Sequence, residues 1–254
     1  HSQSQNTLGV CYGIGDCVEQ DDHKAFSLFE NASKEGRVSA MVNLAWCYEE
    51  GKGVTQDFTK SFEWYLKSAN NGNAAAMFNV ALCYDKGQGV AQDLIKAFGW
   101  YLKAAENECG DAMNIVADCY EKGIGVTQDL NAAFKWYLES AENGNTVGMF
   151  NVGVCYDEGR GEAQDKSKAY EWYLKAANKG NADAMNNIGA YEWELAKKGN
   201  GCFFGVVPSQ NFTKAFEWFL KSANNGNVVA MNIVGWCYEN GRGVTQDKTK
   251  SFEW

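Results

Sequence analysis

The sequence predicts an all-α solenoid of antiparallel helix pairs, with about seven repeats of 36 residues. One observation is a tryptophan that recurs every 36 residues, at Trp64, Trp100, Trp136 and Trp172. A second is a cysteine with the same spacing, at Cys11, Cys47, Cys83, Cys119 and Cys155. A third is that all six methionines occupy one position of the repeat. A fixed period of about 20 to 50 residues is typical of architectures in which each unit packs only on its neighbours.

The first helix of a repeat is illustrated by residues 73–108. Its apolar residues fall at i, i+3, i+4 and i+7 and therefore share one face: Met77, Val80, Ala81 and Tyr84. Gly87 ends this helix, because glycine accepts the left-handed conformation that closes a helix. The G-x-G loop that follows is interpreted as a helix terminator and not as a phosphate-binding loop, since no strand precedes it and no Gly-Lys-Ser/Thr ending is present.

The second helix begins after Asp93, whose carboxylate can accept the unpaired backbone N–H groups of the first turn. Its apolar face contains Ala97, Phe98, Tyr101, Leu102 and Ala105. In most other repeats a glycine marks its end, at Gly36, Gly72, Gly144, Gly180 and Gly226. The capping position recurs as Asp21, Asp57, Asp129, Asp165, Asn211 and Asp247. Because asparagine replaces aspartate once, capping explains this series better than acid–base chemistry does.

The register divides a single solenoid, residues 1–254, into repeats 1–36, 37–72, 73–108, 109–144, 145–180, 181–226 and a partial 227–254. Repeat six contains a ten-residue insertion and has Tyr191 in place of the recurring cysteine. The polar run 194–198 predicts that its first helix is extended. In repeat four, Glu108 and Cys109 replace Gly-Asn, so we expect a different turn before its first helix. Trp254 falls inside a predicted helix that lacks a polar outer face, and we expect a longer protein around this segment.

The string A-M-x5-C-Y-x2-G-x-G-V-x-Q-D-x2-K-A-F-x-W-Y-x-K-A-A-x2-G resembles the Sel-one-like repeat (SLR) family, a relative of the tetratricopeptide repeats. The resemblance covers essentially the whole chain. It implies a right-handed α/α superhelix that serves as an adaptor or scaffold, in settings such as membrane-protein quality control, signalling assemblies and host–bacterium contacts. No catalytic residue set comes with the family.

The composition restricts the classes of partner. The 254 residues are 45% hydrophobic and carry a net charge of 23 − 32 = −9, without a basic cluster. Nucleic acid is therefore not an expected partner, because phosphate neutralisation needs clustered Lys and Arg. No apolar run approaches the ~20 residues of a membrane span, and no signal peptide opens the chain. We expect a cytoplasmic protein; a secreted or lumenal one is the alternative, given family precedents and the glycosylation motifs at Asn31 and Asn211.

Cysteine and histidine usage gives little support for catalysis or a metal. Equivalent cysteines of neighbouring repeats are expected to lie too far apart for a disulfide, since bridged Cα atoms lie within about 7 Å of each other. We therefore expect buried, reduced thiols, with Cys11–Cys17 as the one locally plausible pair. No C-x-x-C pair suggests zinc. The two histidines are His1 and His23, which we place at the terminus and in a loop before a second helix. We predict no catalytic residue, cofactor or metal.

A second acidic series lies near the ends of the first helices, at Glu49, Asp85, Glu121, Asp157 and Glu239. Lysines recur nearby in sequence, at Lys60, Lys96, Lys168, Lys214 and Lys250. We expect these acids to form ion pairs with the lysines or to be solvated, which gives them a structural role.

The best functional signal lies on the first helices, at the positions one and five residues after each methionine. The first set is Val42, Phe78, Asn114, Phe150, Asn186 and Asn232, and the second is Trp46, Leu82, Asp118, Val154, Ala190 and Trp236. These positions vary while the core positions repeat, and several are large and apolar, which predicts a partner-binding surface. In tetratricopeptide-like folds the first helix lines the concave side. Packing between repeats is the alternative explanation.

The insertion of repeat six brings a cysteine and four apolar residues, Cys202, Phe203, Phe204, Val206 and Val207. It either folds back on its own array or contacts a partner, and solubility favours folding back. For the whole chain we predict a protein-interaction scaffold that holds a partner peptide or helix on its concave face. Two other classes stay open: a regulatory or structural segment of a larger signalling polypeptide, for example a kinase-associated one, and a hydrolase that resembles cysteine-rich SLR proteins.

Overall fold

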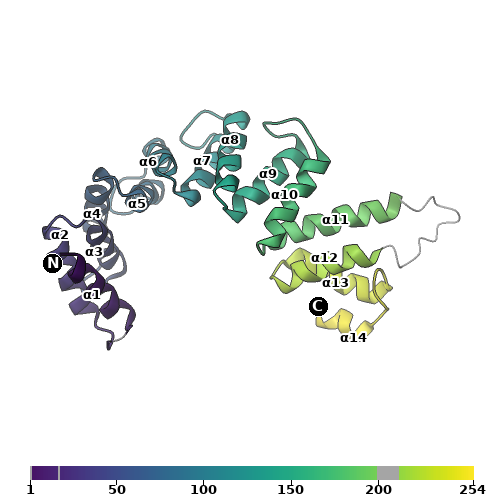
Figure 1. Cartoon of the computed structure of the whole chain (residues 1–254), viewed down its shortest axis with the longest axis horizontal. Helices are drawn as coiled ribbons and strands as arrows, with labels where there is room; N and C mark the ends of the chain where they lie inside the picture. Colours follow the sequence, from purple (N-terminus) through teal and green to yellow (C-terminus); the bar gives the residue numbers. More distant parts are fainter. Residues whose placement is uncertain (1, 17, 199–211) are drawn as a thin grey trace. The chain divides into compact units, whose positions relative to one another are not determined.

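The computed structural model describes residues 2–16, 18–198 and 212–254, and in these residues it contains helices and no strand. The helices are α1 Ser2–Ile14, α2 Asp22–Lys34, α3 Val38–Glu50, α4 Phe58–Asn70, α5 Ala74–Lys86, α6 Leu94–Glu106, α7 Gly110–Lys122, α8 Leu130–Glu142, α9 Thr146–Glu158, α10 Lys166–Asn178, α11 Ala182–Lys198, α12 Thr213–Asn224, α13 Val228–Asn240 and α14 Lys248–Glu253 (Figure 1). Odd-numbered helices are called helix A of their repeat and even-numbered helices are called helix B. The predicted all-α solenoid of paired helices is confirmed.

The helices pack in chain order and form two compact units, residues 1–133 and 134–254. Within each unit a helix A packs on its own helix B, and that helix B packs on the next helix A (Figure 1). Among the described residues, no helix has both the length and the apolar character needed to cross a membrane.

The predicted helix boundaries follow from the caps. The Asp93 Oδ1 accepts the Lys96 backbone N–H at 3.0 Å, and the other described aspartates of the series cap in the same way: Asp21, Asp57, Asp129, Asp165 and Asp247. Asn211, the remaining member, lies outside the described residues. At the other end, helix α5 closes on Gly87, which has φ 69° and donates its N–H to the Cys83 carbonyl.

The second glycine of the G-x-G loop has a different role, which the sequence analysis missed. A Cβ atom at Gly53 would lie 2.1 Å from the carbonyl oxygen of Asp22. The same close approach joins Gly89 to Phe58 and Gly243 to Phe212. The loop of each of these repeats therefore lies against the start of the preceding helix B, and a larger residue would separate the two backbones.

The turn before repeat four corrects one expectation. Glu108 adopts a positive φ of 63°, so it keeps the backbone path that glycine takes in the other repeats. The Cys109 N–H donates to the Ala104 carbonyl at 3.1 Å, as Asn73 N–H does to Ser68 at 3.3 Å. The turn is thus retained, although glutamate is disfavoured in this conformation. The side-chain cap is what is lost, because Cys109 makes no capping bond, whereas Asn73 accepts the Ala76 N–H at 2.8 Å.

Neighbouring repeats are joined by aromatic pairs. A phenylalanine of helix B meets a tyrosine of the next helix A edge to face, with ring centroids between 5.2 and 5.5 Å apart. The pairs are Phe26–Tyr48, Phe62–Tyr84, Phe98–Tyr120, Phe134–Tyr156 and Phe216–Tyr238. Such pairs contribute about 0.5–1.5 kcal/mol each beyond their burial.

The recurring cysteines belong to the core. Cys47, Cys83, Cys119, Cys155 and Cys237 are buried, as predicted, and no disulfide joins any two of them. Burial raises the pKa of Cys47, Cys83, Cys119 and Cys237 to about 11. Cys17 and the insertion, with Cys202, Phe203, Phe204, Val206 and Val207, lie outside the described residues. The predicted extension of the repeat-six helix is confirmed, because α11 runs to Lys198.

Candidate partner-binding surface

The residues one and five positions after each methionine form what we call the helix A surface. In residues 1–133 it comprises Val42, Trp46, Phe78, Leu82, Asn114 and Asp118. Of these, Trp46 is exposed (43%) and the others are half-buried. In residues 134–254 it comprises Phe150, Val154, Asn186, Ala190, Asn232 and Trp236, of which Ala190, Asn232 and Trp236 (46%) are exposed.

Around Trp46 the surface extends onto repeat one. The Asn43 side chain of α3 donates to Asn6 Oδ1 of α1 at 3.0 Å, which fixes the two helices side by side. Val10, one repeat before Trp46, is exposed, and so is Ile14 at 72%. The sequence analysis missed Val10 because repeat one has Gln5 where the other repeats have methionine. Val10 lies 36 residues before Trp46, so the repeat period alone is enough to identify it.

The phenylalanines of the surface also pack within their own repeats. The Phe78 ring lies against Tyr101 of α6 with centroids 5.6 Å apart, and the Phe150 ring lies against Tyr173 of α10 at 5.7 Å. Both rings are half-buried. Asp118 forms an ion pair with Lys122 at 2.6 Å. Phe78 and Phe150 are therefore partly structural residues, and the tryptophans are the exposed large apolar residues of the surface.

In residues 134–254 the accessible part centres on Trp236. Its ring lies 5.8 Å from that of Trp193 on α11. Trp236 also borders a hollow of about 280 Å³ together with Val229, Asn232 and Ile233 on the same helix. Three of its four lining residues are apolar, and Val229 is 58% exposed, so the hollow is mainly apolar and open to solvent.

The acidic series near the ends of helix A differs from the expectation at Glu49 and Asp85, whereas Asp157 forms an ion pair with a lysine, Lys166. The Glu49 and Asp85 carboxylates accept hydrogen bonds from buried tyrosines of helix B: Tyr65 donates to Glu49 at 2.8 Å, and Tyr101 donates to Asp85 at 3.5 Å. Burial raises the pKa of both tyrosines well above its usual value. Three of the recurring lysines pair instead with the capping aspartates: Lys60–Asp57, Lys96–Asp93 and Lys250–Asp247.

Repeats one and six lack this tyrosine–carboxylate pair. In repeat six, Trp193 stands in the carboxylate position and Phe219 in the tyrosine position, with ring centroids 6.2 Å apart. In repeat one, Gly13 and the buried Phe29 stand in the two positions. Wherever the hydroxyl is missing, the carboxylate is missing too.

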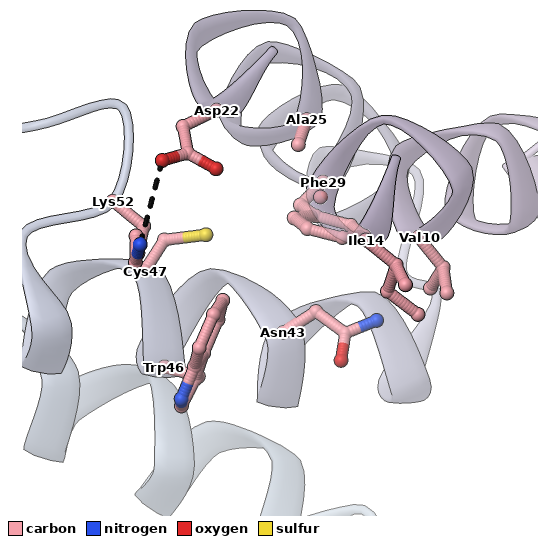
Figure 2. Close-up of a pocket in the computed structure, with 10 residues that line it drawn as sticks. Val10, Ile14, Asp22, Ala25, Phe29, Asn43, Trp46, Cys47 and Lys52 are labelled. Atoms are coloured by element: carbon pink, nitrogen blue, oxygen red, sulfur yellow. Dashed lines mark ion pairs between the residues drawn. The ribbon is translucent and has the colours of Figure 1, made fainter. Parts of the chain in front are cut away.

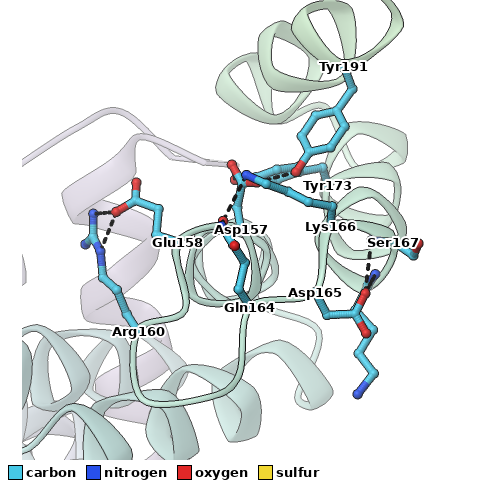
Figure 3. Close-up of polar contacts among 10 residues, drawn as sticks. Asp157, Glu158, Arg160, Gln164, Asp165, Lys166, Ser167, Tyr173 and Tyr191 are labelled. Atoms are coloured by element: carbon cyan, nitrogen blue, oxygen red, sulfur yellow. Dashed lines mark hydrogen bonds and ion pairs between the residues drawn. The ribbon is translucent and has the colours of Figure 1, made fainter. Parts of the chain in front are cut away.

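The junction of repeats five and six holds a distinct polar network (Figure 3). Asp157 accepts hydrogen bonds from Tyr173 at 3.5 Å and from Tyr191, and it pairs with Lys166 at 2.5 Å. Glu192, which takes the place of the tyrosine of the aromatic pairs, is nearly buried. It accepts the Tyr170 hydroxyl at 2.7 Å and pairs with Lys214 at 2.6 Å. Both carboxylates are satisfied within the protein, which indicates a structural role.

The potential metal ligands in the described part of the chain are its His, Cys, Asp and Glu side chains. No three His, Cys, Asp or Glu residues lie close enough there to hold a metal ion. His23 lies in the first turn of α2, not in the loop before it, because the cap is Asp21. Its Nδ1 lies 3.0 Å from the Gly53 carbonyl oxygen, so the ring contributes to the contact between loop and helix.

Comparison with family models gives seven matches to the Sel1 repeat, at residues 2–36, 38–73, 74–109, 110–145, 146–181, 182–227 and 228–254. A Sel1 repeat protein from Oxalobacter formigenes has a similar structure, with 27% identity, a TM-score of 0.79 and coverage of 98% of this chain and 94% of that one. A protective antigen of uropathogenic Escherichia coli with an SLR fold has 30% identity and a TM-score of 0.56, and this chain spans 60% of its length.

A Pseudomonas aeruginosa immunity protein shares the fold alone, at 20% identity and a TM-score of 0.50, with 85% of this chain and 79% of that one covered. Comparison with curated proteins gives no match.

Proposed function

The chain belongs to the Sel1 repeat family, and on that premise we propose that it is a scaffold whose helix A surface binds a peptide or helix of a partner protein. Proteins of this family generally act as protein-interaction scaffolds and are typically not enzymes. Binding without catalysis is therefore the function proposed for this chain. The net charge of −9 supports a protein partner over nucleic acid.

The observation that carries this proposal is the pair of exposed tryptophans at one position of the repeat. Trp46 and Trp236 are 43% and 46% exposed, each on a helix A and each beside other exposed apolar residues. Tryptophan is enriched among the residues that contribute most to binding at protein interfaces. Exposed apolar patches of this kind mark interaction sites on protein surfaces.

The compartment proposed for this function is the cytoplasm. The buried Cys47, Cys83, Cys119 and Cys237 form no disulfide, which suits a reducing environment. Mass spectrometry of protein from its native host tests this proposal, and a glycan on Asn31 would contradict it.

The experiment that tests binding selects peptides from a random phage-displayed library against the immobilised full chain. Selected peptides are then titrated by calorimetry against the wild type, Trp46→Ala and Trp236→Ala. A peptide anchored on one tryptophan should lose about 2 kcal/mol of binding free energy, or about 30-fold in affinity, in the matching variant.

Ile95→Ala is the matched control, because Ile95 is 74% exposed but lies on helix B. Peptides that bind both tryptophan variants with wild-type affinity, or that lose affinity on Ile95→Ala instead, would contradict the proposed surface.

A further inference from the structure

Repeat one contains a pocket of about 170 Å³ between α1, α2 and α3. Figure 2 shows the side chains around it. Val10 and Ile14 reach it from α1, Ala25 and Phe29 from α2, and Trp46 and Cys47 from α3. Its remaining lining consists of Gly13, Asp22, Asn43 and Lys52. The pocket adjoins Trp46, so it opens beside the helix A surface.

The pocket exists because repeat one lacks the tyrosine–carboxylate pair. Gly13 stands in the position of Glu49, and Phe29 stands in that of Tyr65. A Cβ atom built on Gly13 would meet a single neighbour within 4 Å, the Ala25 Cβ at 3.8 Å. The absent side chain of Gly13 and the absent hydroxyl of Phe29 together leave the space open. In repeat two the two corresponding positions carry the hydrogen-bonded pair of Tyr65 and Glu49.

The lining is apolar, and its polar groups are already paired. Asp22 and Lys52 form an ion pair at 3.6 Å at one end of the pocket (Figure 2), and Asn43 is bonded to Asn6. The Cys47 thiol points toward the space in Figure 2, and burial raises the pKa of this thiol to about 11, so it is neutral at pH 7. Nothing in the pocket offers a free charge to a ligand, and a charged ligand would lose its hydration without compensation.

We propose that this pocket binds one apolar side chain of a partner peptide, of the size of leucine or phenylalanine. An apolar cavity of about 150 Å³ stays dry and accepts a benzene ring. The pocket of repeat one has a similar volume and a mainly apolar lining, but it is open to the surface, so a side chain can enter it from outside. Its mouth carries the exposed Ile14 and Trp46, which would flank the peptide backbone. This inference rests on the proposed function, because it assigns the pocket to the same peptide that covers Trp46.

The test uses toluene as a probe of the pocket, titrated into the full chain and followed by methyl NMR. We expect saturable shifts that are confined to Val10, Ile14 and Ala25. Gly13→Met fills the pocket with a long, flexible side chain and should weaken toluene binding at least tenfold. The double variant Gly13→Glu, Phe29→Tyr should do the same, because it installs the pair that fills repeat two.

Gly99→Met is the matched control. Gly99 also lies within a helix of residues 1–133, and a Cβ there meets nothing within 4 Å, so the same substitution fills no pocket. Toluene affinity should be unchanged in this variant. Absence of saturable shifts in the wild type, or equal toluene affinity in the filled variants, overturns the pocket as a binding site.

The peptides selected against the wild type separate this inference from the proposed function. Peptides that depend on Trp46 should lose at least tenfold in affinity for Gly13→Met and none for Gly99→Met. The wild type could bind toluene while Gly13→Met still binds the peptides with full affinity. That result would show that no peptide side chain enters the pocket, but it would not contradict binding to the helix A surface. If no peptide is selected although toluene binds the wild type, the scaffold function is contradicted. The proposal that a peptide side chain occupies the pocket is then contradicted as well.

Discussion

Trp193 packs on Phe219 with ring centroids 6.2 Å apart, at the two positions where repeats two, three and five place a carboxylate and a tyrosine hydroxyl. Both members of the pair are replaced together in repeat six, and Gly13 and Phe29 replace both in repeat one. A hydroxyl buried without its acceptor would cost about 1–3 kcal/mol. The paired replacement avoids that cost.

Phe219→Tyr should therefore destabilise the protein by about 1–3 kcal/mol, because the new hydroxyl would face the Trp193 ring and not a carboxylate. Urea unfolding followed by circular dichroism measures the loss. The double variant Phe219→Tyr, Trp193→Glu supplies the acceptor and should recover part of the stability. If the single variant is as stable as the wild type, the hydroxyl and carboxylate are not coupled.

Glu108→Gly should stabilise the protein by about 1 kcal/mol, because Glu108 has a φ of 63° that glycine adopts without steric cost. Thermal unfolding gives the comparison. Gly72→Glu is the converse variant at a position with φ 85°, and it should destabilise by a similar amount. The two substitutions should change the stability in opposite directions. If Glu108→Gly leaves the stability unchanged, glutamate is not strained at this position.

Cys109→Asn should stabilise the protein independently of the change at Glu108. Asparagine at this position can accept a backbone N–H of the first turn of α7, as Asn73 accepts the Ala76 N–H in the preceding repeat. The expected gain is about 0.5–2 kcal/mol. Urea unfolding of Cys109→Asn beside Cys109→Ala separates the cap from the loss of the thiol. Equal stability of the two variants would mean that no cap forms.

Acid should weaken the helix B caps. Hydrogen bonds from the backbone N–H groups of Lys24, Lys60 and Lys96 lower the pKa of Asp21, Asp57 and Asp93 below the ordinary value of an aspartate. A lowered folded-state pKa contributes stability that is complete above the unfolded pKa and is lost as the pH falls through the folded pKa. The contribution of these caps should therefore decline below about pH 4.

The triple variant with asparagine at these three positions isolates this effect, since an amide caps without titrating. Melting temperatures between pH 6 and 2.5 should fall less steeply for the variant than for the wild type. Parallel curves would show that other carboxylates govern the acid response.

Thiol reactivity should follow burial. Cys47, Cys83, Cys119 and Cys237 have a pKa of about 11, so they should resist iodoacetamide at pH 7.5 until the chain unfolds. The half-buried Cys11 and Cys109 should react earlier. Cys202, in the insertion, is predicted from the sequence to react fastest. Peptide mass spectrometry against time checks the order, and rapid labelling of Cys83 in folded protein would contradict it.

The parts of the fold that the sequence predicts are those set by local physics. Gly87, Asp93 and the apolar face around Met77 each act within one turn of helix, so their spacing is sufficient evidence. The partner of Glu49 could not be predicted in this way, because Tyr65 is 16 residues away and belongs to the other helix of the pair. Sequence proximity favoured lysine as the partner, whereas the direction of the tyrosine side chain decides the contact.

The candidate site was only partly predictable for a related reason. The repeat register places Trp46 and Trp236 on the surface correctly, since their exposure follows from the position on helix A. It does not reveal that Phe78 packs on Tyr101, which depends on the angle between two helices. The pocket of repeat one is defined by a side chain that Gly13 lacks, and an absence of this kind becomes visible only when the surrounding helices are in place.

The close approach of Gly53 to Asp22 has an evolutionary consequence. Several repeats carry both halves of that contact, a loop glycine and a helix B start, so gene duplication or loss of a whole unit would create a new boundary that already fits. The boundary between repeats five and six is different, because Tyr170 and Glu192 replace the phenylalanine–tyrosine pair of the other boundaries and match only each other. Array length should thus vary among descendants of this gene by units taken from residues 37–144, while the order of repeats five and six is inherited unchanged.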